Sequence, residues 1–429
     1  MSSRLQDPIS IGTMTLRNRL YRAPVLEGAG SAKDPAKVYA KHFVPNAEAG
    51  VGLIIQGNTI VQPEGRTSPG MSAVHGRDSI LAFRPMTEAV QSAGGRIVIQ
   101  LGHGGTYALE SWHQEAMAAR TRPPLAPSRL PWWVGAILGR VHIPTTAEVE
   151  GIIQRFGQVA AWTREAGYDG VQLAGSNAKL LHQFLSPVYN RRTDKYGGSL
   201  EGRTRILKEI REAIAREAGS DYPVLLKYTA VENTLIGKGI TIKEGVEIAQ
   251  RAEEWGYQAV TPVIADMLPN TAICRGDFPK HTFRHKKLRQ TMREAAGNAY
   301  RFYVIASAMW FSSRRYPFAP VWNRPVFSEI RKSVSIPVFA VGGIRSPQEA
   351  ASILQNGEAD LIGVGRPFYA EPNLPARFLA VSEGEAFPPL VCENCNRCIM
   401  PQMLGMAGVC YNPETHQRRK ELAATSSSS

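Results

Sequence analysis

The sequence lacks the features of a membrane-spanning or exported protein. No apolar run approaches the ~18–20 residues that a membrane span requires. The opening residues, Met-Ser-Ser-Arg-Leu-Gln-Asp-Pro, carry no apolar signal core. Only five cysteines occur among 429 residues, which argues against a framework of disulfide bonds. We therefore expect a cytoplasmic protein without a membrane partner.

Acidic residues are the scarcer charge, with 37 of them against 50 basic residues and a formal net charge of +13. The basic residues are scattered, and the densest run, His285–Arg289, is short. No basic stripe alternates with aromatic residues, as single-stranded nucleic-acid binding would require. We expect no nucleic-acid partner, and we interpret the excess charge as favouring anionic phosphates, including those of cofactors.

Short, continuous apolar runs alternate with helical stretches along the chain. Such runs are typical of parallel strands that are buried on both faces. A threonine cap is expected at Thr146, and Pro347 after Ser346 predicts the start of another helix. Eight strand–helix repeats predict an α/β fold, a closed (β/α)8 TIM barrel. The predicted strands are Leu20–Ala23, Gly52–Gly57, Ile97–Leu101, Gly170–Leu173, Val224–Tyr228, Ala259–Val263, Val338–Gly342 and Leu361–Gly365.

Two connections are too long to be simple turns. Gly104–Pro144 follows the third predicted strand, and Ala265–Pro325 follows the sixth. Both emerge at the barrel face where active sites are built. We interpret them either as lids over a substrate cavity or as contacts within a homo-oligomer. The barrel is expected over residues 1–385, and a short cysteine-rich extension over residues 386–429.

Glycines close the last two predicted strands. The seventh ends Val341-Gly342-Gly343, and the eighth ends Gly363-Val364-Gly365-Arg366. Glycine lets backbone N–H groups approach a phosphate, and an arginine guanidinium can clamp it. Together they predict the phosphate site that is usual in this fold.

Several motifs then follow one another in the order of a known family. The sequence resembles the old yellow enzymes, and the resemblance spans residues ~5 to ~412. It implies an oxidoreductase that binds FMN and takes NAD(P)H as its reductant. The motifs are Pro8-Ile-Ser-Ile-Gly, Leu16-Arg-Asn-Arg-Leu with Ala23-Pro24, Gly52-Leu-Ile-Ile, Gln100-Leu-Gly-His-Gly-Gly, Gln183-Phe-Leu-Ser-Pro, Asn190-Arg-Arg-Thr-Asp-Lys-Tyr-Gly-Gly-Ser and Gly363-Val-Gly-Arg-Pro.

The resemblance also implies a role for each matching residue. Backbone groups near Pro24, Gly57 and Asn58 would line the isoalloxazine, and Gln100 would hydrogen-bond its pyrimidine edge. Lys227 stands where most relatives carry an arginine beside flavin N1 and O2. At ~4 Å and a dielectric of ~20, its attraction for the reduced flavin is about 4 kcal/mol, or roughly 90 mV. The phosphate would be held by Gly342, Gly343, Gly365 and Arg366.

The catalytic patch after the fourth strand departs from the family pattern. Relatives read His-x-x-His or His-x-x-Asn with a tyrosine two positions later, whereas this chain reads Ala174-Gly-Ser-Asn177-Ala-Lys179. We expect Asn177 to bind a carbonyl and Lys179 to replace the tyrosine as proton donor. Leu26 replaces a residue that hydrogen-bonds the flavin in many relatives.

Four of the five cysteines are crowded near the carboxy terminus. Cys392, Cys395 and Cys398 lie three residues apart, and Cys410 follows. The spacing suits an iron–sulfur cluster, with tetrahedral zinc as the alternative. It resembles the cluster loop of the trimethylamine dehydrogenase and 2,4-dienoyl-CoA reductase families. A cluster here would either be structural or need another electron carrier, such as a partner protein.

Three functions follow from these observations. The first is reduction of an electron-poor alkene, an α,β-unsaturated carbonyl compound, by NAD(P)H through FMN. The second is an FMN-dependent dehydrogenase or demethylase of an amine or alcohol-like substrate, with electrons leaving through the cysteine-bound centre. The third is a flavin-binding scaffold without turnover, because the family's histidine and tyrosine are missing.

Overall fold

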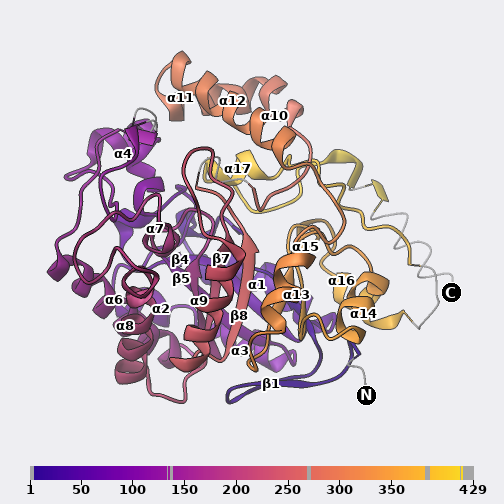
Figure 1. The fold of residues 1–429 in the computed structure, drawn as a ribbon. Coiled ribbons are helices and arrows are strands. Elements are labelled where there is room, and N and C mark those ends of the chain that lie inside the picture. The colour runs from indigo at the N-terminus through magenta and orange to yellow at the C-terminus, as the bar shows by residue number, and fades with distance from the viewer. Residues whose placement is uncertain are drawn as a thin grey trace.

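Eight parallel strands form the centre of the molecule (Figure 1). The computed structural model describes residues 4–132, 134–135, 139–267, 272–381, 387–415 and 417–418. The strands pair in the order β8-β7-β6-β5-β4-β3-β10-β9, and a parallel bridge between Val260 and Val338 joins the two ends. The predicted TIM barrel is therefore confirmed. Its strands are β3 (Leu20–Arg22), β4 (Leu53–Ile60), β5 (Arg96–Gly102), β6 (Gly170–Gly175), β7 (Val224–Val231), β8 (Ala259–Ile264), β9 (Phe339–Val341) and β10 (Leu361–Val364).

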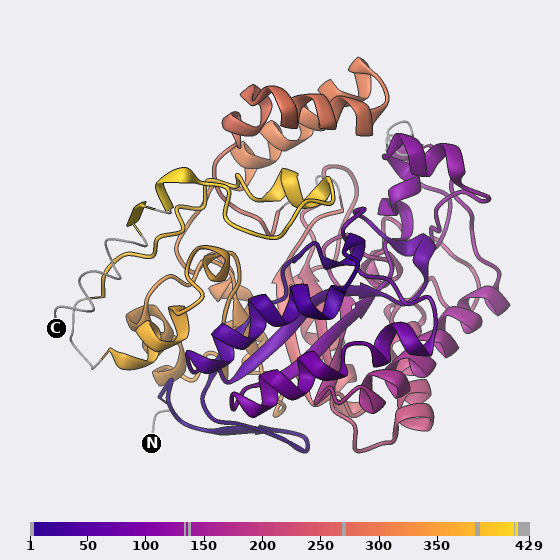
Figure 2. The same ribbon diagram turned by 180° about the vertical axis from the view of Figure 1, so that it is seen from behind.

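Helices follow the strands and cover the outside of the barrel (Figures 1 and 2). Their apolar faces pack on the strands in one large core, because buried parallel strands leave no face for water. The covering helices are α1 (Pro35–Glu48), α2 (Arg77–Leu81), α3 (Arg84–Ser92), α6 (Thr146–Glu165), α8 (Leu200–Ala218), α9 (Ile242–Glu254), α13 (Arg324–Arg331), α14 (Pro347–Gln355), α15 (Pro367–Ala370) and α16 (Leu374–Ala380).

Of two predicted helix starts, one lies a residue earlier than expected and the other is confirmed. The cap of α6 is Thr145, one residue before the expected Thr146, and it forms a capping box with Glu148. Thr146 Oγ1 instead donates to Asp194 Oδ2 at 2.7 Å. The start of α14 is confirmed, with Ser346 as its cap and Pro347 in the first turn.

A hairpin that the sequence did not predict lies at the amino-terminal end of the barrel (Figure 1). Its strands β1 (Ile9–Ile11) and β2 (Met14–Leu16) pair antiparallel. Buried side chains from the hairpin join those that point into the barrel, such as Tyr21 and Phe339, in one apolar cluster. The inside of the barrel is therefore a packed core, and a site is expected at the other end of the barrel.

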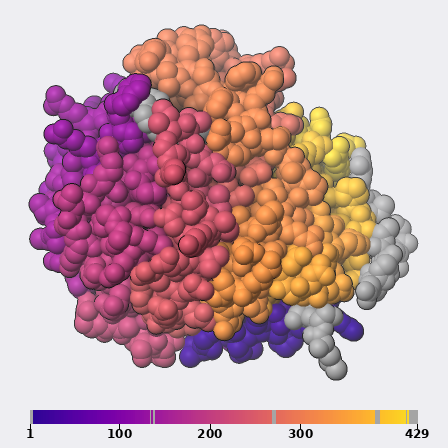
Figure 3. All heavy atoms as spheres, in the orientation of Figure 1, coloured from indigo at the N-terminus to yellow at the C-terminus, as the bar shows by residue number. Residues whose placement is uncertain are grey.

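The two long connections and the carboxy-terminal segment lie at that other end (Figures 1 and 3). The connection after β5 contains η3 (Gly105–Tyr107), η4 (Leu109–Ser111) and α4 (Gln114–Ala119). The connection after β8 contains α10 (Lys280–Arg284), α11 (Lys286–Ala296) and α12 (Ala299–Arg315). Helix α17 (Ile399–Met403) lies beneath α12, and both share a small apolar cluster with α11. Among the described residues, no helix combines the length and the apolar character needed to cross a membrane. The remaining short elements are η1 (Ala29–Ser31), η2 (Pro63–Gly65) and α7 (Leu180–Leu185).

Candidate active site

A cavity of about 570 Å³ lies between the carboxyl ends of the barrel strands and the helices above them. Parallel strands deliver the residues at their ends to one place, which is why segments far apart in sequence meet here. Gly57, Gly342, Gly343 and Gly365, which the sequence also predicted for the site, are not among the residues that line the cavity. The predicted residues that do line it are Pro24, Asn58, Gln100, Asn177, Lys179, Lys227, Arg366 and Cys398, the last of which was predicted as a metal ligand.

The loop after β6 presents Asn177 to the cavity through an unusual backbone. Asn177 and Ala178 both adopt positive φ, 54° and 57°, which is uncommon outside glycine. Two buried side chains hold this loop, because Ala178 N donates to His182 Nδ1 at 3.0 Å and Gln183 Nε2 donates to Ala178 O at 2.8 Å. Asn177 Oδ1 is buried and has no hydrogen-bond partner among the described residues. The amide is therefore held ready for a ligand.

Lys179 lies on the same loop and is partly buried at the cavity wall. Its Nζ donates a hydrogen bond to Thr67 Oγ1 at 3.1 Å, and Thr67 also lines the cavity. Burial lowers the pKa of Lys179 from 10.5 to about 8. The ammonium can therefore release a proton near neutral pH, as a general acid must.

Asn58, Gln100 and Lys227 form the floor of the cavity. Both amide atoms of Asn58 are buried without a partner among the described residues. Gln100 Nε2 donates to Gln172 Oε1 at 2.7 Å, and the Gln100 side-chain oxygen takes no part in that bond. Lys227 is 7% exposed, and burial lowers its pKa to about 8. An unpaired amide in the same cavity as a cation fits the edge of an isoalloxazine, which carries hydrogen-bonding atoms and gains negative charge on reduction.

Gly57 serves close packing instead of lining the cavity. A Cβ there would collide with the Val25 carbonyl and lie 2.7 Å from Glu27 Oε2. That carboxylate pairs with Arg22 at 2.8 Å inside the core. The position therefore excludes any side chain, for a reason unrelated to the cavity.

The predicted phosphate end is more enclosed than the sequence suggested. Gly342 and Gly343 have positive φ, but Val321 N donates to Gly343 O at 3.1 Å and the Trp322 ring lies against Gly342. The segment before α13 therefore covers both glycines, which explains their absence from the cavity wall. Arg366 donates to the Asn396 side chain and to Arg275 O, the latter at 2.7 Å. Its role in holding a phosphate stays a prediction.

The carboxy-terminal cysteines lie in a segment above the barrel, partly buried. Burial raises the pKa of Cys398 to about 12, Arg366 opposes that rise, and Cys392, Cys274 and Cys410 add to it. These thiols are therefore near one another. Within the described ranges, however, no three His, Cys, Asp or Glu side chains are arranged to hold a metal ion. The metal site predicted at Cys392, Cys395, Cys398 and Cys410 stays a prediction.

The sequence did not predict the residues that cover the cavity on the side away from the barrel, which we call its roof. Helices α11, α12 and α17 supply Met292, Met309, Met400 and Met403, and α12 adds Arg301. No motif marks these residues, since they converge from connections whose spacing carries no periodic signal. Thr67 was also missed, because only the fold brings it to Lys179.

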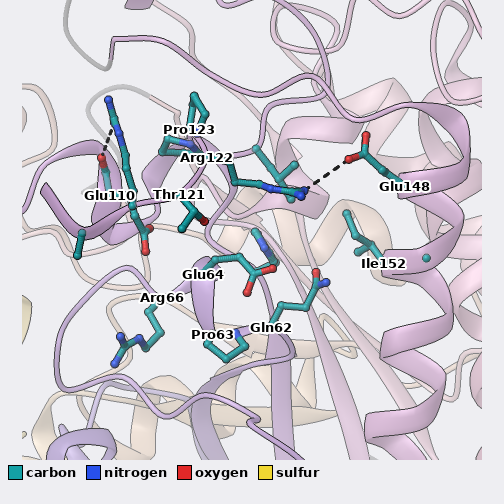
Figure 4. A pocket seen from close by; sticks show the side chains of 16 residues that line it. Gln62, Pro63, Glu64, Arg66, Glu110, Thr121, Arg122, Pro123, Glu148 and Ile152 are labelled. Carbon is teal, nitrogen blue, oxygen red and sulfur yellow. Dashed lines mark hydrogen bonds and ion pairs between the residues drawn. The ribbon is translucent and has the colours of Figure 1, made fainter. Parts of the chain in front are cut away.

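A second hollow of about 510 Å³ lies beside the barrel, between the segment after β4 and α6 (Figure 4). Charges of both signs line it, including an ion pair of 3.6 Å between Arg122 and Glu148. Arg122 is exposed, and Glu148 is also bonded to His142 at 2.9 Å. This hollow contains none of the predicted site residues, so we place the candidate site in the larger cavity.

Comparisons with known proteins agree with the barrel fold. The model of the NADH:flavin oxidoreductase / NADH oxidase family matches residues 4–302 and 286–381. NADH oxidase of Thermoanaerobacter brockii is 31% identical over 389 residues, which is 90% of this chain and 52% of the relative. Cinnamate reductase of Clostridium sporogenes is 27% identical over 411 residues, 91% of this chain and 54% of the relative. The chain thus spans about half the length of each of these two relatives. In shape it is similar to a 2-naphthoyl-CoA reductase, with a TM-score of 0.75 at 20% identity, covering 97% of this chain and 58% of that one.

Proposed function

The chain belongs to the NADH:flavin oxidoreductase / NADH oxidase family, and on that premise we propose that it uses FMN and NAD(P)H to reduce an electron-poor alkene. The proposed substrate class is an α,β-unsaturated carbonyl compound. The name of the Clostridium relative, a cinnamate reductase, supports an alkene conjugated to a carbonyl group.

One observation carries the proposal: Asn177 and Lys179 share a cavity with the unpaired Asn58 amide and Lys227. When bound, FMN would accept hydride from NAD(P)H and donate it to carbon. The Asn177 amide would hydrogen-bond the substrate carbonyl oxygen and so draw electrons from the alkene. Lys179 would then protonate the other alkene carbon, and Lys227 would stabilise negative charge in the cavity.

Ala174 limits the rate that this arrangement can reach. It lines the cavity where relatives place a histidine, and it has no group to donate to the carbonyl. Losing one strengthened hydrogen bond costs ~1.5–3 kcal/mol, or ~10–100-fold in rate. We therefore expect slow turnover of simple enones.

A cysteine-bound metal centre is not part of the proposal, because no group of three His, Cys, Asp or Glu side chains able to hold a metal ion is found among the described residues. The dehydrogenase alternative depends on that centre to remove electrons, so the two functions differ in whether the four thiols hold a metal. Metal and sulfide analysis of anaerobically purified protein tests this choice. Four irons per chain would restore the dehydrogenase alternative, and one zinc would support a structural site.

The direct test is anaerobic reduction of the purified protein, followed by the absorbance of the oxidised flavin. We expect a yellow protein that releases FMN on denaturation, bleaches with NADH or NADPH, and recovers its colour with an enone. Recovery with an amine and not with an enone would reverse the proposed direction. A protein that binds no FMN would overturn the proposal, and bound FMN that never bleaches would support the scaffold alternative.

A further inference from the structure

The upper half of the cavity is apolar and adaptable. Its walls include Met292, Met309, Met400 and Met403 together with Phe302 and Ile305. Methionine is unbranched, flexible and polarisable, so it adjusts to ligands of varied shape and contacts aromatic rings favourably. A wall lined in this way suits a ligand with a bulky apolar body.

The charged side chains of the cavity are all cationic. Lys179, Lys227, Arg301 and Arg366 line it, and no carboxylate is found among the described residues of its wall. Unpaired cations in an apolar cavity repel one another and attract anions strongly, because the local dielectric is low. Lys179 and Lys227 have functions in the proposed reaction, and Arg366 is predicted to hold the FMN phosphate. No function has yet been assigned to Arg301.

Arg301 lies in the first turn of α12, where it connects the roof to the segment after β5. Its Nη2 donates to Ser111 O at 3.2 Å, and its Nη1 approaches Met117 Sδ at 2.7 Å. The Arg301 backbone N–H donates to the Asn298 side chain at 2.9 Å, which anchors this end of the helix. A guanidinium has five N–H donors, so donors remain after these two contacts. Arg301 is partly buried, which strengthens any ion pair that it makes.

From these contacts we infer that the alkene substrate carries an anionic group, a carboxylate or its equivalent, which Arg301 binds while its apolar body lies among the methionines. The inference rests on the proposed function for the reacting end of the substrate. It adds that a bulky, amphipathic acid is the preferred substrate class and that Arg301 determines this preference.

Binding can be tested without turnover. The ligands are saturated ketones of the form 4-(3-oxobutyl)benzoate, with the carboxylate attached to the ring directly or through one to three methylene groups. Each is paired with its neutral methyl ester, and affinity for the FMN-loaded protein is measured by calorimetry. We expect the best carboxylate to bind at least ~10-fold more tightly than its ester, the scale of a charge-assisted hydrogen bond. A short keto acid without the ring should bind at least ~10-fold more weakly than the best carboxylate.

Three variants separate recognition by Arg301 from general charge effects. Arg301→Met should bring the carboxylate within ~2-fold of its ester and leave the ester's affinity unchanged. Arg301→Lys should keep part of the preference. Arg314→Met is the matched control, because Arg314 lies on the same helix, exposed and over the Trp310 ring, and is not part of the cavity wall. It should leave both affinities unchanged.

The outcomes distinguish this inference from the proposed function. Equal affinities for every acid–ester pair, or a preference that survives Arg301→Met, overturn the inference even if enones re-oxidise the flavin. If Arg301→Met instead weakens only NAD(P)H, then the anion that Arg301 binds belongs to the reductant, and the inference is again overturned. Failure of every enone to re-oxidise the flavin overturns the proposed function, whatever the binding data show.

Discussion

Replacing Lys179 by methionine tests the proton transfer most directly. Burial lowers the pKa of Lys179 from 10.5 to about 8, which corresponds to a penalty of about 3 kcal/mol on the charged form. The amine is therefore about nine-tenths protonated at pH 7. If it donates the proton, re-oxidation of the flavin by enone should be constant below pH 7 and fall about tenfold per unit above pH 8. A solvent-exposed lysine would keep that profile flat to about pH 10.

Lys179→Met should slow the re-oxidation of the flavin ~10²-fold or more and abolish the decline near pH 8. Reduction by NAD(P)H should stay unchanged, because that step needs no proton from Lys179. Anaerobic stopped-flow absorbance measures both steps separately. The variant should also be more stable at neutral pH, by up to about 3 kcal/mol. The folded-state pKa lies below the unfolded one, so the stability of the unmutated chain rises between pH 8 and 10.5, and methionine removes that dependence.

Thr67→Val is the matched control, because it removes the acceptor at 3.1 Å and keeps the lysine. Loss of that bond disfavours the charged amine, so the decline in rate should move below pH 8. A Lys179→Met protein with unchanged rate and unchanged pH profile would refute the reasoning, and solvent would then supply the proton.

Three further predictions concern the cofactor and the core. Lys227→Met should lower the flavin midpoint potential by several tens of millivolts, up to ~90 mV, in spectroelectrochemical titrations, because a buried cation is lost; an unchanged potential with FMN bound would place the lysine away from the flavin. Gly102→Ala should weaken FMN binding at least ~10-fold in fluorescence titrations, since the new Cβ would lie 2.6 Å from Asn58 Oδ1, whereas Gly151→Ala, with open space around it, should not. Glu232→Gln should raise the melting temperature at pH 8 and not at pH 4.5. Burial raises the pKa of Glu232 to about 7, so the unmutated protein loses up to about 3 kcal/mol of its free energy of unfolding as the pH rises from 4.5 to 7. Equal melting temperatures of the two proteins at pH 8 would contradict this.

The barrel could be predicted because buried parallel strands leave a strong local signal. Each of the eight apolar runs became a strand, and the differences lie at strand ends. Strand β4 continues to Ile60 because its pairing with β5 shifts register between Gln56 and Thr59, so Gly57 lies inside the strand instead of ending it. The amino-terminal hairpin was not predicted, since two strands of three residues are too short to show a pattern.

The candidate site was predicted where motifs end strands and missed where distant segments converge. Asn177 and Lys179 were located from a motif, but the positive φ of Asn177 and the bond from Lys179 to Thr67 depend on tertiary contacts. The exposure of Gly342 to a ligand was overestimated, because a motif shows that a backbone position needs glycine and does not show what covers it. Arg301 reaches the cavity only through the packing of α12, which the spacing of residues could not reveal.

The pairing of β3 with β10 also determines when this protein can become complete during translation. Leu20 pairs with Ile362, about 340 residues later in the chain. A ribosome that adds ~5–20 residues per second needs roughly 20 s to a minute for that interval. Throughout it, the outer edge of β3 lacks its final partner strand, and Arg366 has not yet been made. We therefore expect nascent chains stalled before β10 to bind chaperones and to retain no flavin, and chains released at full length to acquire both closure and cofactor in one late step.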